Sequence, residues 1–150
     1  EDLSQSRRAE VVDEFQHAWS GYKKYAWGYD ELQPVSKTGK TWFKLGTTIV
    51  DAMSTIIIMN LEEEYQEGVD WLEKNFDISN AGRNSFFEFN IRIFGGLLSA
   101  YNLTEEHIFK KLADDIAGYI PSAFPSAMGG MPYPEFNFQK KDGEVAGWRR

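Results

Sequence analysis

Two charged side chains of opposite sign lie within an apolar stretch that is long enough to form a helix. The stretch is SFFEFNIRIFGGLLSAY, residues 85–101, and its two charges are Glu88 and Arg92. A carboxyl group in a partly dry site can donate a proton as a general acid, and a guanidinium can bind oxygen atoms in its plane. The spacing of four residues predicts that both side chains project from the same face of a helix.

The residues around this pair form a narrow stripe of polar and small side chains. At helical spacing the stripe contains Ser85, Glu88, Arg92, Gly96 and Ser99. Segment 47–59 repeats the pattern with Asp51, preceded by Thr47 or Thr48 and followed by Ser54 and Thr55. Each of these two helices is therefore predicted to present one acid on a polar stripe, and the apolar flanks on either side of the stripe are predicted to pack in the core.

Two interpretations of this stripe compete. In the first, Glu88 and Arg92 form an ion pair inside the protein, in the order along the helix that favours such a pair. In the second, Glu88, Arg92 and Asp51 point into a water-filled cavity at the centre of a helical array. There, burial among phenylalanines would favour the protonated carboxyl of Glu88, whereas the charge of Arg92 would favour the carboxylate. The second interpretation predicts a general acid.

The elements that must position these side chains are mostly helices. Apolar periodicity predicts helices over residues 6–26, 47–59, 61–76, 85–101 and 104–120, with Thr104 as the N-cap of the last one. Residues 28–42 and 77–84 are expected to be loops, because they contain helix-breaking Gly, Pro and Asn residues. The stretch EFNFQKKDGE, residues 135–144, predicts a short strand and a turn.

Two kinds of helix alternate along the chain. The segments near 61–76 and 104–120 have one charged face, which is typical of helices that face solvent. The segments near 47–59 and 86–101 are apolar nearly all round, which is typical of helices that are buried on most sides. The pattern predicts an all-α fold of helical hairpins in inner and outer layers, with a β excursion near the C-terminus. Residues 1–150 show no internal domain boundary.

Composition narrows the class of partner. The net charge is −7 and lysines and arginines form no long cluster, which argues against nucleic acid and anionic membranes as partners. The longest apolar run, IIIM, is too short to span a bilayer. The chain has no cysteine, so thiolate chemistry is excluded. The triplet NLT makes Asn102 a weak candidate for N-glycosylation.

Four stretches of the sequence, in this order, resemble the class I α-mannosidases, glycoside hydrolase family 47. The stretches are HAWSGYKKYAWGYDELQPVS, LGTTIVDAMSTIIIM, FFEFNIRIFGGLLSAYNLT and PYPEFNF. The resemblance covers the chain from about residue 7 to about residue 143. It implies the N-terminal portion of an (αα)7 barrel, the remainder of the family domain being absent from this sequence.

The resemblance also implies an activity and a set of site residues. Members of the family are inverting enzymes that remove α-1,2-linked mannose from high-mannose N-glycans in the endoplasmic reticulum or Golgi lumen, or as secreted proteins. By position, Glu88 matches the general acid and Arg92 a sugar-contacting residue. Asp51, Asp30 and Glu31 match acidic positions expected to bind substrate. A calcium cofactor is implied, but its threonine ligand lies outside this chain, so no metal ligand is expected here.

Three hypotheses about function follow. The first is a glycosidase segment with Glu88 as the acid, which is incomplete for catalysis because an inverting hydrolase also needs a base to activate water. The second is a non-catalytic remnant or fragment that binds mannose glycans. The third is a helical bundle in which Glu88 and Arg92 only pair with each other. For a partial barrel, exposed apolar surface predicts self-association.

Overall fold

The computed structural model describes residues 3–144, and helices dominate this part of the chain. The longer helices are α1 (Leu3–Ala26), α2 (Thr47–Ile58), α3 (Glu62–Asn75), α5 (Gly95–Thr104) and α6 (His107–Ala117). Between α3 and α5 lie the one-turn helix α4 (Phe86–Glu88) and the π-helix η2 (Phe89–Phe94). Short 3-10 turns are η1 (Ile78–Asn80), η3 (Ile120–Ala123) and η4 (Ser126–Met128).

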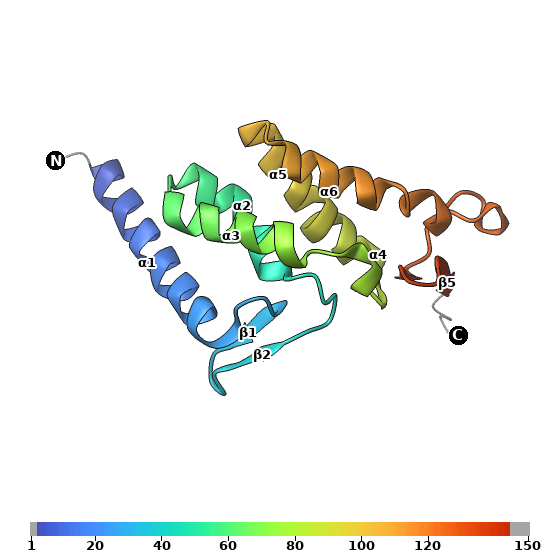
Figure 1. Cartoon of the computed structure of the whole chain (residues 1–150), viewed down its shortest axis with the longest axis horizontal. Helices are drawn as coiled ribbons and strands as arrows, with labels where there is room; N and C mark the ends of the chain where they lie inside the picture. Colours follow the sequence, from blue (N-terminus) through green and yellow to red (C-terminus); the bar gives the residue numbers. More distant parts are fainter. Residues whose placement is uncertain (1–2, 145–150) are drawn as a thin grey trace.

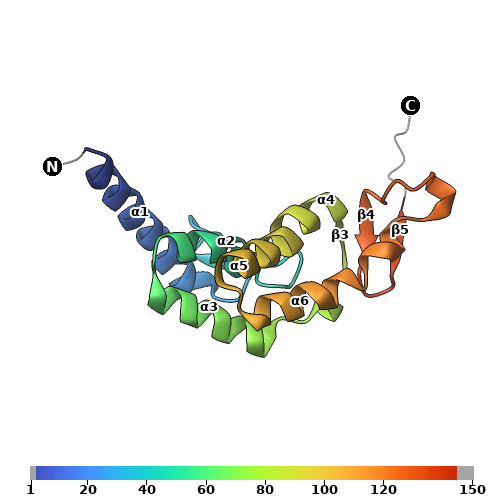
Figure 2. The same cartoon turned by 90° about the horizontal axis from the view of Figure 1, so that it is seen from above.

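The helices form two layers, as the alternation in the sequence predicts. Helix α2 packs against α3 and α5, and α5 packs against α6. Figure 2 shows α2 and α5 in one layer and α3 and α6 in the other. Helix α1 contacts the hairpin of β1 and β2, and its N-terminal half extends away from the other helices (Figure 1). The predicted hairpin arrangement with an inner and an outer layer is confirmed.

The ends of the outer helices follow local sequence, with one correction. Helix α3 begins with three glutamates and has Lys74 in its last turn, which matches the helix dipole. The predicted N-cap role of Thr104 is wrong. Thr104 is the last residue of α5, and its hydroxyl donates to the carbonyl oxygen of Ala100 at 2.9 Å. Glu105 then takes a left-handed conformation (φ 59°), and α6 begins two residues later, at His107.

Five short strands form two small antiparallel sheets. Strands β1 (Glu31–Gln33) and β2 (Thr38–Lys40) form a hairpin inside the segment that was predicted to be a loop. Strands β3 (Arg83–Ser85), β4 (Glu135–Asn137) and β5 (Asp142–Glu144) form a second sheet, with β4 in the centre. The β excursion predicted over residues 135–144 is confirmed. Strands of three residues leave little alternation in the sequence, which is why β1, β2 and β3 were not predicted.

An aromatic cluster joins the second sheet to the start of the inner helix. Phe86 and Phe89 lie on the helix, Phe136 and Phe138 lie on or beside β4, and all four are buried. The rings of Phe89 and Phe138 are 4.0 Å apart, and those of Phe136 and Phe138 are 5.0 Å apart in an edge-to-face arrangement. Because Phe86 and Phe89 are anchored on either side of Glu88, the position of Glu88 on the helix is fixed by the core.

One flank of the inner layer is open in this chain, contrary to the prediction that these helices are buried on most sides. Exposed fractions reach 66% for Phe87, 51% for Ile91 and 44% for Leu98, and 62% for Ile58 on α2. The opposite flank, with Phe89, Ile93 and Leu97, is fully buried. No helix within residues 3–144 combines the length and the hydropathy needed to cross a bilayer.

Candidate functional site

Arg92 joins the two predicted acids into a triad that spans two helices. Its Nε donates to Glu88 Oε2 at 2.6 Å, and its Nη1 donates to Asp51 Oδ2 at 3.0 Å. Glu88 ends α4 and Arg92 lies in η2, whereas Asp51 comes from α2. These hydrogen bonds, that to Glu88 first and then that to Asp51, hold the pKa of Arg92 above its ordinary value. The triad thus places two acids on one guanidinium.

The triad fits neither of the two competing interpretations completely. The ion pair of the first interpretation is present, but it is not in dry packing, because the side chains of Glu88, Arg92 and Asp51 are 33%, 41% and 40% exposed. A closed cavity, as in the second interpretation, is not formed around them by residues 3–144. The three head groups instead lie on an open, water-accessible face, next to the exposed side chains of Phe87 and Ile91.

A close contact between two helix backbones places Asp51 beside Arg92. A Cβ atom at Gly96 would lie 3.1 Å from the carbonyl oxygen of Val50 and 3.2 Å from its Cγ1. Any larger residue at position 96 would therefore push α5 away from α2. Asp51 directly follows Val50, and Arg92 precedes Gly96 by one turn. The glycine thus allows the approach that the Arg92 to Asp51 hydrogen bond requires.

The candidate acid, Glu88, lies where the α-helix α4 changes into the π-helix η2. Residues 89–94 form a π-helix, and the N–H of Gly95 donates to the carbonyl oxygen of Asn90, five residues earlier. Single π turns inside α-helices occur often at functional sites, because the extra residue shifts the side chains that follow. Ser85 begins this helix, and its hydroxyl accepts a hydrogen bond from the N–H of Glu88 at 3.3 Å. The backbone of the acid is therefore held by a cap.

Asp30 does not face the triad, and its predicted role in substrate binding is revised. The residue is only 2% exposed. Its carboxylate accepts hydrogen bonds from the N–H groups of Trp42, Lys44, Leu45 and Thr47, and from the Thr47 hydroxyl, at 2.7–3.1 Å. Both oxygens are thus occupied by the loop before α2. In this structure Asp30 positions the start of the helix that carries Asp51.

The remaining predicted residues lie apart from the triad. Glu31 is on β1, where its carboxylate pairs with Lys40 of β2 at 2.9 Å. Within residues 3–144, no hydrogen bond or ion pair joins Glu31 or Asp30 to Glu88, Arg92 or Asp51. Asn102 is exposed near the C-terminal end of α5, and its glycosylation stays a prediction.

The family model described as glycosyl hydrolase family 47 matches residues 14–150. The chain belongs to this family. The endoplasmic reticulum mannosyl-oligosaccharide 1,2-alpha-mannosidase of Rattus norvegicus is 43% identical over 131 residues, which cover 87% of this chain and 20% of that protein. Mannosyl-oligosaccharide 1,2-alpha-mannosidase MNS1 of Arabidopsis thaliana is 40% identical over 147 residues, which cover 97% of this chain and 26% of that protein.

A solved family 47 structure has the same arrangement of elements. The alpha-1,2-mannosidase from Trichoderma reesei matches with a TM-score of 0.81 at 27% sequence identity, over 89% of this chain and 31% of that one. This match confirms that the helical hairpins are part of the α/α barrel of the family. The family 47 chain spans about a fifth of the length of the first curated relatives that it matches.

The residues present do not form a calcium site by themselves. Within residues 3–144 there is no group of three or more His, Asp or Glu side chains that could hold a metal ion. The two carboxylates of the triad, Glu88 and Asp51, both accept hydrogen bonds from Arg92.

Replacement of Gly96 tests the contact that assembles the triad. We expect Gly96→Val to lower the free energy of unfolding by about 1–3 kcal/mol, because a larger side chain overpacks the contact with Val50. Gly118→Val is the matched control, since a Cβ there lies at an ordinary 3.6 Å from the Asp115 carbonyl oxygen. Urea denaturation of both variants measures the difference. Equal stability of the two variants would contradict the role assigned to Gly96.

Proposed function

We propose that this chain is the N-terminal segment of an α-1,2-mannosidase that trims high-mannose N-glycans with inversion. The single observation that supports this activity is the triad on a water-accessible face of the inner helices, in a chain of family 47. Glu88 would protonate the oxygen of the leaving group. Arg92 would hold the Glu88 carboxyl in place and bind sugar hydroxyls, and Asp51 would hold Arg92 from the other side.

The whole protein would act in the secretory pathway, in the lumen of the endoplasmic reticulum or Golgi, or as a secreted enzyme. Support comes from its relatives, one of which is named as an endoplasmic reticulum mannosidase. Calcium, implied by the family resemblance, would be bound by the whole protein, with its threonine ligand outside this segment. High-mannose N-glycan would be the substrate.

The isolated chain is expected to be inactive. An inverting glycosidase uses a second carboxylate, set about 6.5–9.5 Å from the acid, to activate water. The other carboxylate of the triad is that of Asp51, and its Oδ2 already accepts a hydrogen bond from Arg92. The second candidate function, a non-catalytic fragment that binds mannose glycans, is favoured by this same observation.

A chimaera separates these two functions. Residues 14–150 of this chain would replace the corresponding segment of the Rattus norvegicus relative, which supplies the rest of the barrel. Release of mannose from a high-mannose glycan, followed by mass spectrometry, supports a catalytically competent segment. A folded chimaera that binds glycan without release supports the binding function. The isolated chain, tested in parallel with calcium, is expected to release no mannose.

We further propose that the isolated chain self-associates through its exposed apolar flank. Phe87 and Ile91 lie one turn apart and are more than half exposed, and Leu98 on α5 is 44% exposed. Exposed apolar side chains of this kind favour contact with a second copy of the chain. We expect the sedimentation coefficient to rise with concentration for the unaltered chain. Phe87→Ser together with Ile91→Ser should keep the chain monomeric.

Val35 provides the control for this experiment. It is 98% exposed on the turn between β1 and β2, away from the apolar flank. Val35→Ser should leave the concentration dependence unchanged. A chain that sediments as a monomer at all concentrations, with a single cooperative melting transition, would contradict self-association.

A further inference from the structure

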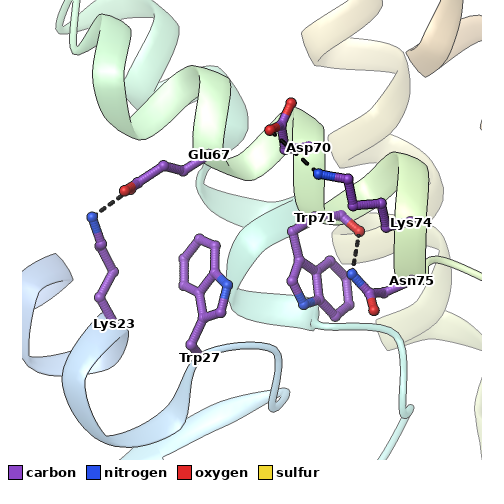
Figure 3. Close-up of a pocket in the computed structure, with 7 residues that line it drawn as sticks. All are labelled: Lys23, Trp27, Glu67, Asp70, Trp71, Lys74 and Asn75. Carbon is purple, nitrogen blue, oxygen red and sulfur yellow. Dashed lines mark hydrogen bonds and ion pairs between the residues drawn. The ribbon is translucent and has the colours of Figure 1, made fainter.

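A cleft between the end of α1 and the C-terminal half of α3 brings two tryptophans together with five polar side chains. Its volume is about 440 Å³, within the range of small-ligand sites. Figure 3 shows the indoles of Trp27 and Trp71 beside each other, with charged side chains around them. None of these residues belongs to the triad, which lies on α2, α4 and η2.

The indole of Trp71 packs closely against two glycines. Gly28 and Gly46 both have positive φ angles, +82° and +65°. A Cβ atom at Gly46 would lie 2.4 Å from Trp71 Cη2, and one at Gly28 would lie 2.8 Å from Trp71 Nε1. Both positions favour glycine, because φ is positive there and because a Cβ atom would collide with the Trp71 ring. The Trp71 ring therefore lies directly against the backbone at both glycines, one of which follows Trp27.

Trp27 is supported from the other side of the cleft. Its ring packs edge-on against the ring of Trp19, with 5.8 Å between the two centroids. The centroid of the Tyr22 ring is also 5.8 Å away. Trp19 and Tyr22 are both buried, whereas Trp27 remains partly exposed. Two rigid aromatic rings provide contact area at little cost in conformational entropy.

The charges around the cleft balance each other. Lys23 of α1 forms an ion pair with Glu67 of α3, and Lys74 pairs with Asp70 at 3.5 Å. The four charges sum to zero, and each cation has an acid beside it. The cleft therefore has no net charge that would attract an anion or a cation, and it suits a neutral ligand.

The polar groups can still both donate and accept hydrogen bonds. The Asn75 amide donates to the Trp71 carbonyl oxygen at 2.9 Å, which leaves its own oxygen as an acceptor. Asp70 accepts from Gln66 at 3.1 Å, and this bond and Lys74 lower the pKa of Asp70, so it is a carboxylate at neutral pH. The lysine ammonium groups supply donors. Hydroxyl groups, which do both, match this mixture.

We propose that the cleft between Trp27 and Trp71 is an accessory binding site for a neutral sugar residue. A pyranose has an apolar C–H face, which can lie against an indole, and hydroxyl groups at its edge, which can reach Asp70, Lys74 and Asn75. The site lies on the outer-layer helix α3, so it would hold a glycan at a distance from the triad. The choice of mannose as the sugar rests on the proposed function, whereas the site itself does not depend on the triad.

Nuclear magnetic resonance of the indole N–H groups tests this proposal. The chain carrying Glu88→Gln, which removes the candidate acid, would be titrated with α-1,2-linked mannobiose. We expect saturable shifts of the Trp27 and Trp71 signals in the millimolar range. The signal of Trp42, whose Nε1 atom is buried and which does not line the cleft, should not move. A sulfated disaccharide should bind more weakly than the neutral one.

Two sets of variants then assign the binding. Trp27→Ala should weaken it about tenfold or more, because an aromatic anchor is lost, and Trp27→Phe should weaken it less. The double variant Asp70→Asn with Lys74→Met changes only exposed side chains and should also weaken binding, so the test does not depend on Trp27→Ala folding. Absence of saturable shifts, or unchanged affinity in Trp27→Ala and in the double variant, would overturn the proposal. Neither result depends on mannose release by the chimaera.

Discussion

Exchange of Glu88 for glutamine is expected to lower mannose release by the chimaera about 10²- to 10⁴-fold, the usual contribution of a general acid. Glutamine has the size of glutamate and can still accept from Arg92 Nε, so the local packing is preserved. It cannot give up a proton to the leaving group. The rate constant for mannose release under single-turnover conditions measures this effect without interference from product release.

The control for Glu88→Gln is the same exchange at an exposed acid. Glu63 lies in the first turn of α3 on the solvent side, and Glu63→Gln should leave the rate unchanged. If Glu88→Gln reduced the rate no more than Glu63→Gln does, Glu88 would not be the acid. The triad would then be a structural ion pair, worth only about 0.2–1 kcal/mol per exposed pair.

Exchange of Asp30 for asparagine is expected to lower the free energy of unfolding by about 2–6 kcal/mol at neutral pH. The amide keeps one acceptor oxygen, so two of the four N–H groups lose their acceptor and face an NH₂ group instead. Each buried group left without a partner costs about 1–3 kcal/mol. Urea denaturation measures the loss, and Asp13→Asn on the exposed surface of α1 is the matched control, expected to be neutral.

The same residue predicts a dependence of stability on pH. Burial by itself raises the pKa of Asp30, but the hydrogen bonds from Trp42, Lys44 and Thr47 outweigh it, and the pKa is lowered from its ordinary value. The carboxylate is therefore favoured in the folded state. Its contribution is present above about pH 4, the pKa of an unfolded aspartate, and is lost as the pH falls through the lower pKa of the folded state.

The two effects of Asp30 can be checked together. Because Asp30→Asn has no carboxylate at this position, the stability difference between the variant and the unaltered chain should shrink as the pH falls below about 4. A difference that stays constant down to the lowest pH at which the chain is folded would contradict the role of the carboxylate. Such a result would mean that the shape of the side chain, and not its charge, causes the stability difference.

Periodicity in the sequence was sufficient for the layers of the fold. Helices α3 and α6 each have one charged face, and α2 and α5 are mostly apolar, so the assignment to outer and inner layers needed only local pattern. The stripe with Glu88 and Arg92 was also predicted, since residues four apart share a helix face. The family resemblance was carried by stretches of sequence that are contiguous and long.

Other features depend on residues far apart in the chain, which local pattern cannot bring together. Asp51 and Arg92 are 41 positions apart, and their hydrogen bond requires the close approach of α5 to α2 at Gly96. Asp30 was predicted to bind substrate because the family resemblance matches it to an acidic position of the site. In the structure its partners are backbone N–H groups 12 to 17 residues later.

Local patterns along the chain were enough to predict the family, the order and layering of the helices, and the acid and base that share one helical face. The tertiary structure decided which of the acids face solvent, because exposure depends on what packs across each helix and not on spacing along it. It also decided that Trp27 and Trp71 share a cleft, since Trp71 lies on α3 and the glycines that admit its ring lie before and after the β1–β2 hairpin. Contacts between distant segments fix these positions, and only the folded chain brings those segments together.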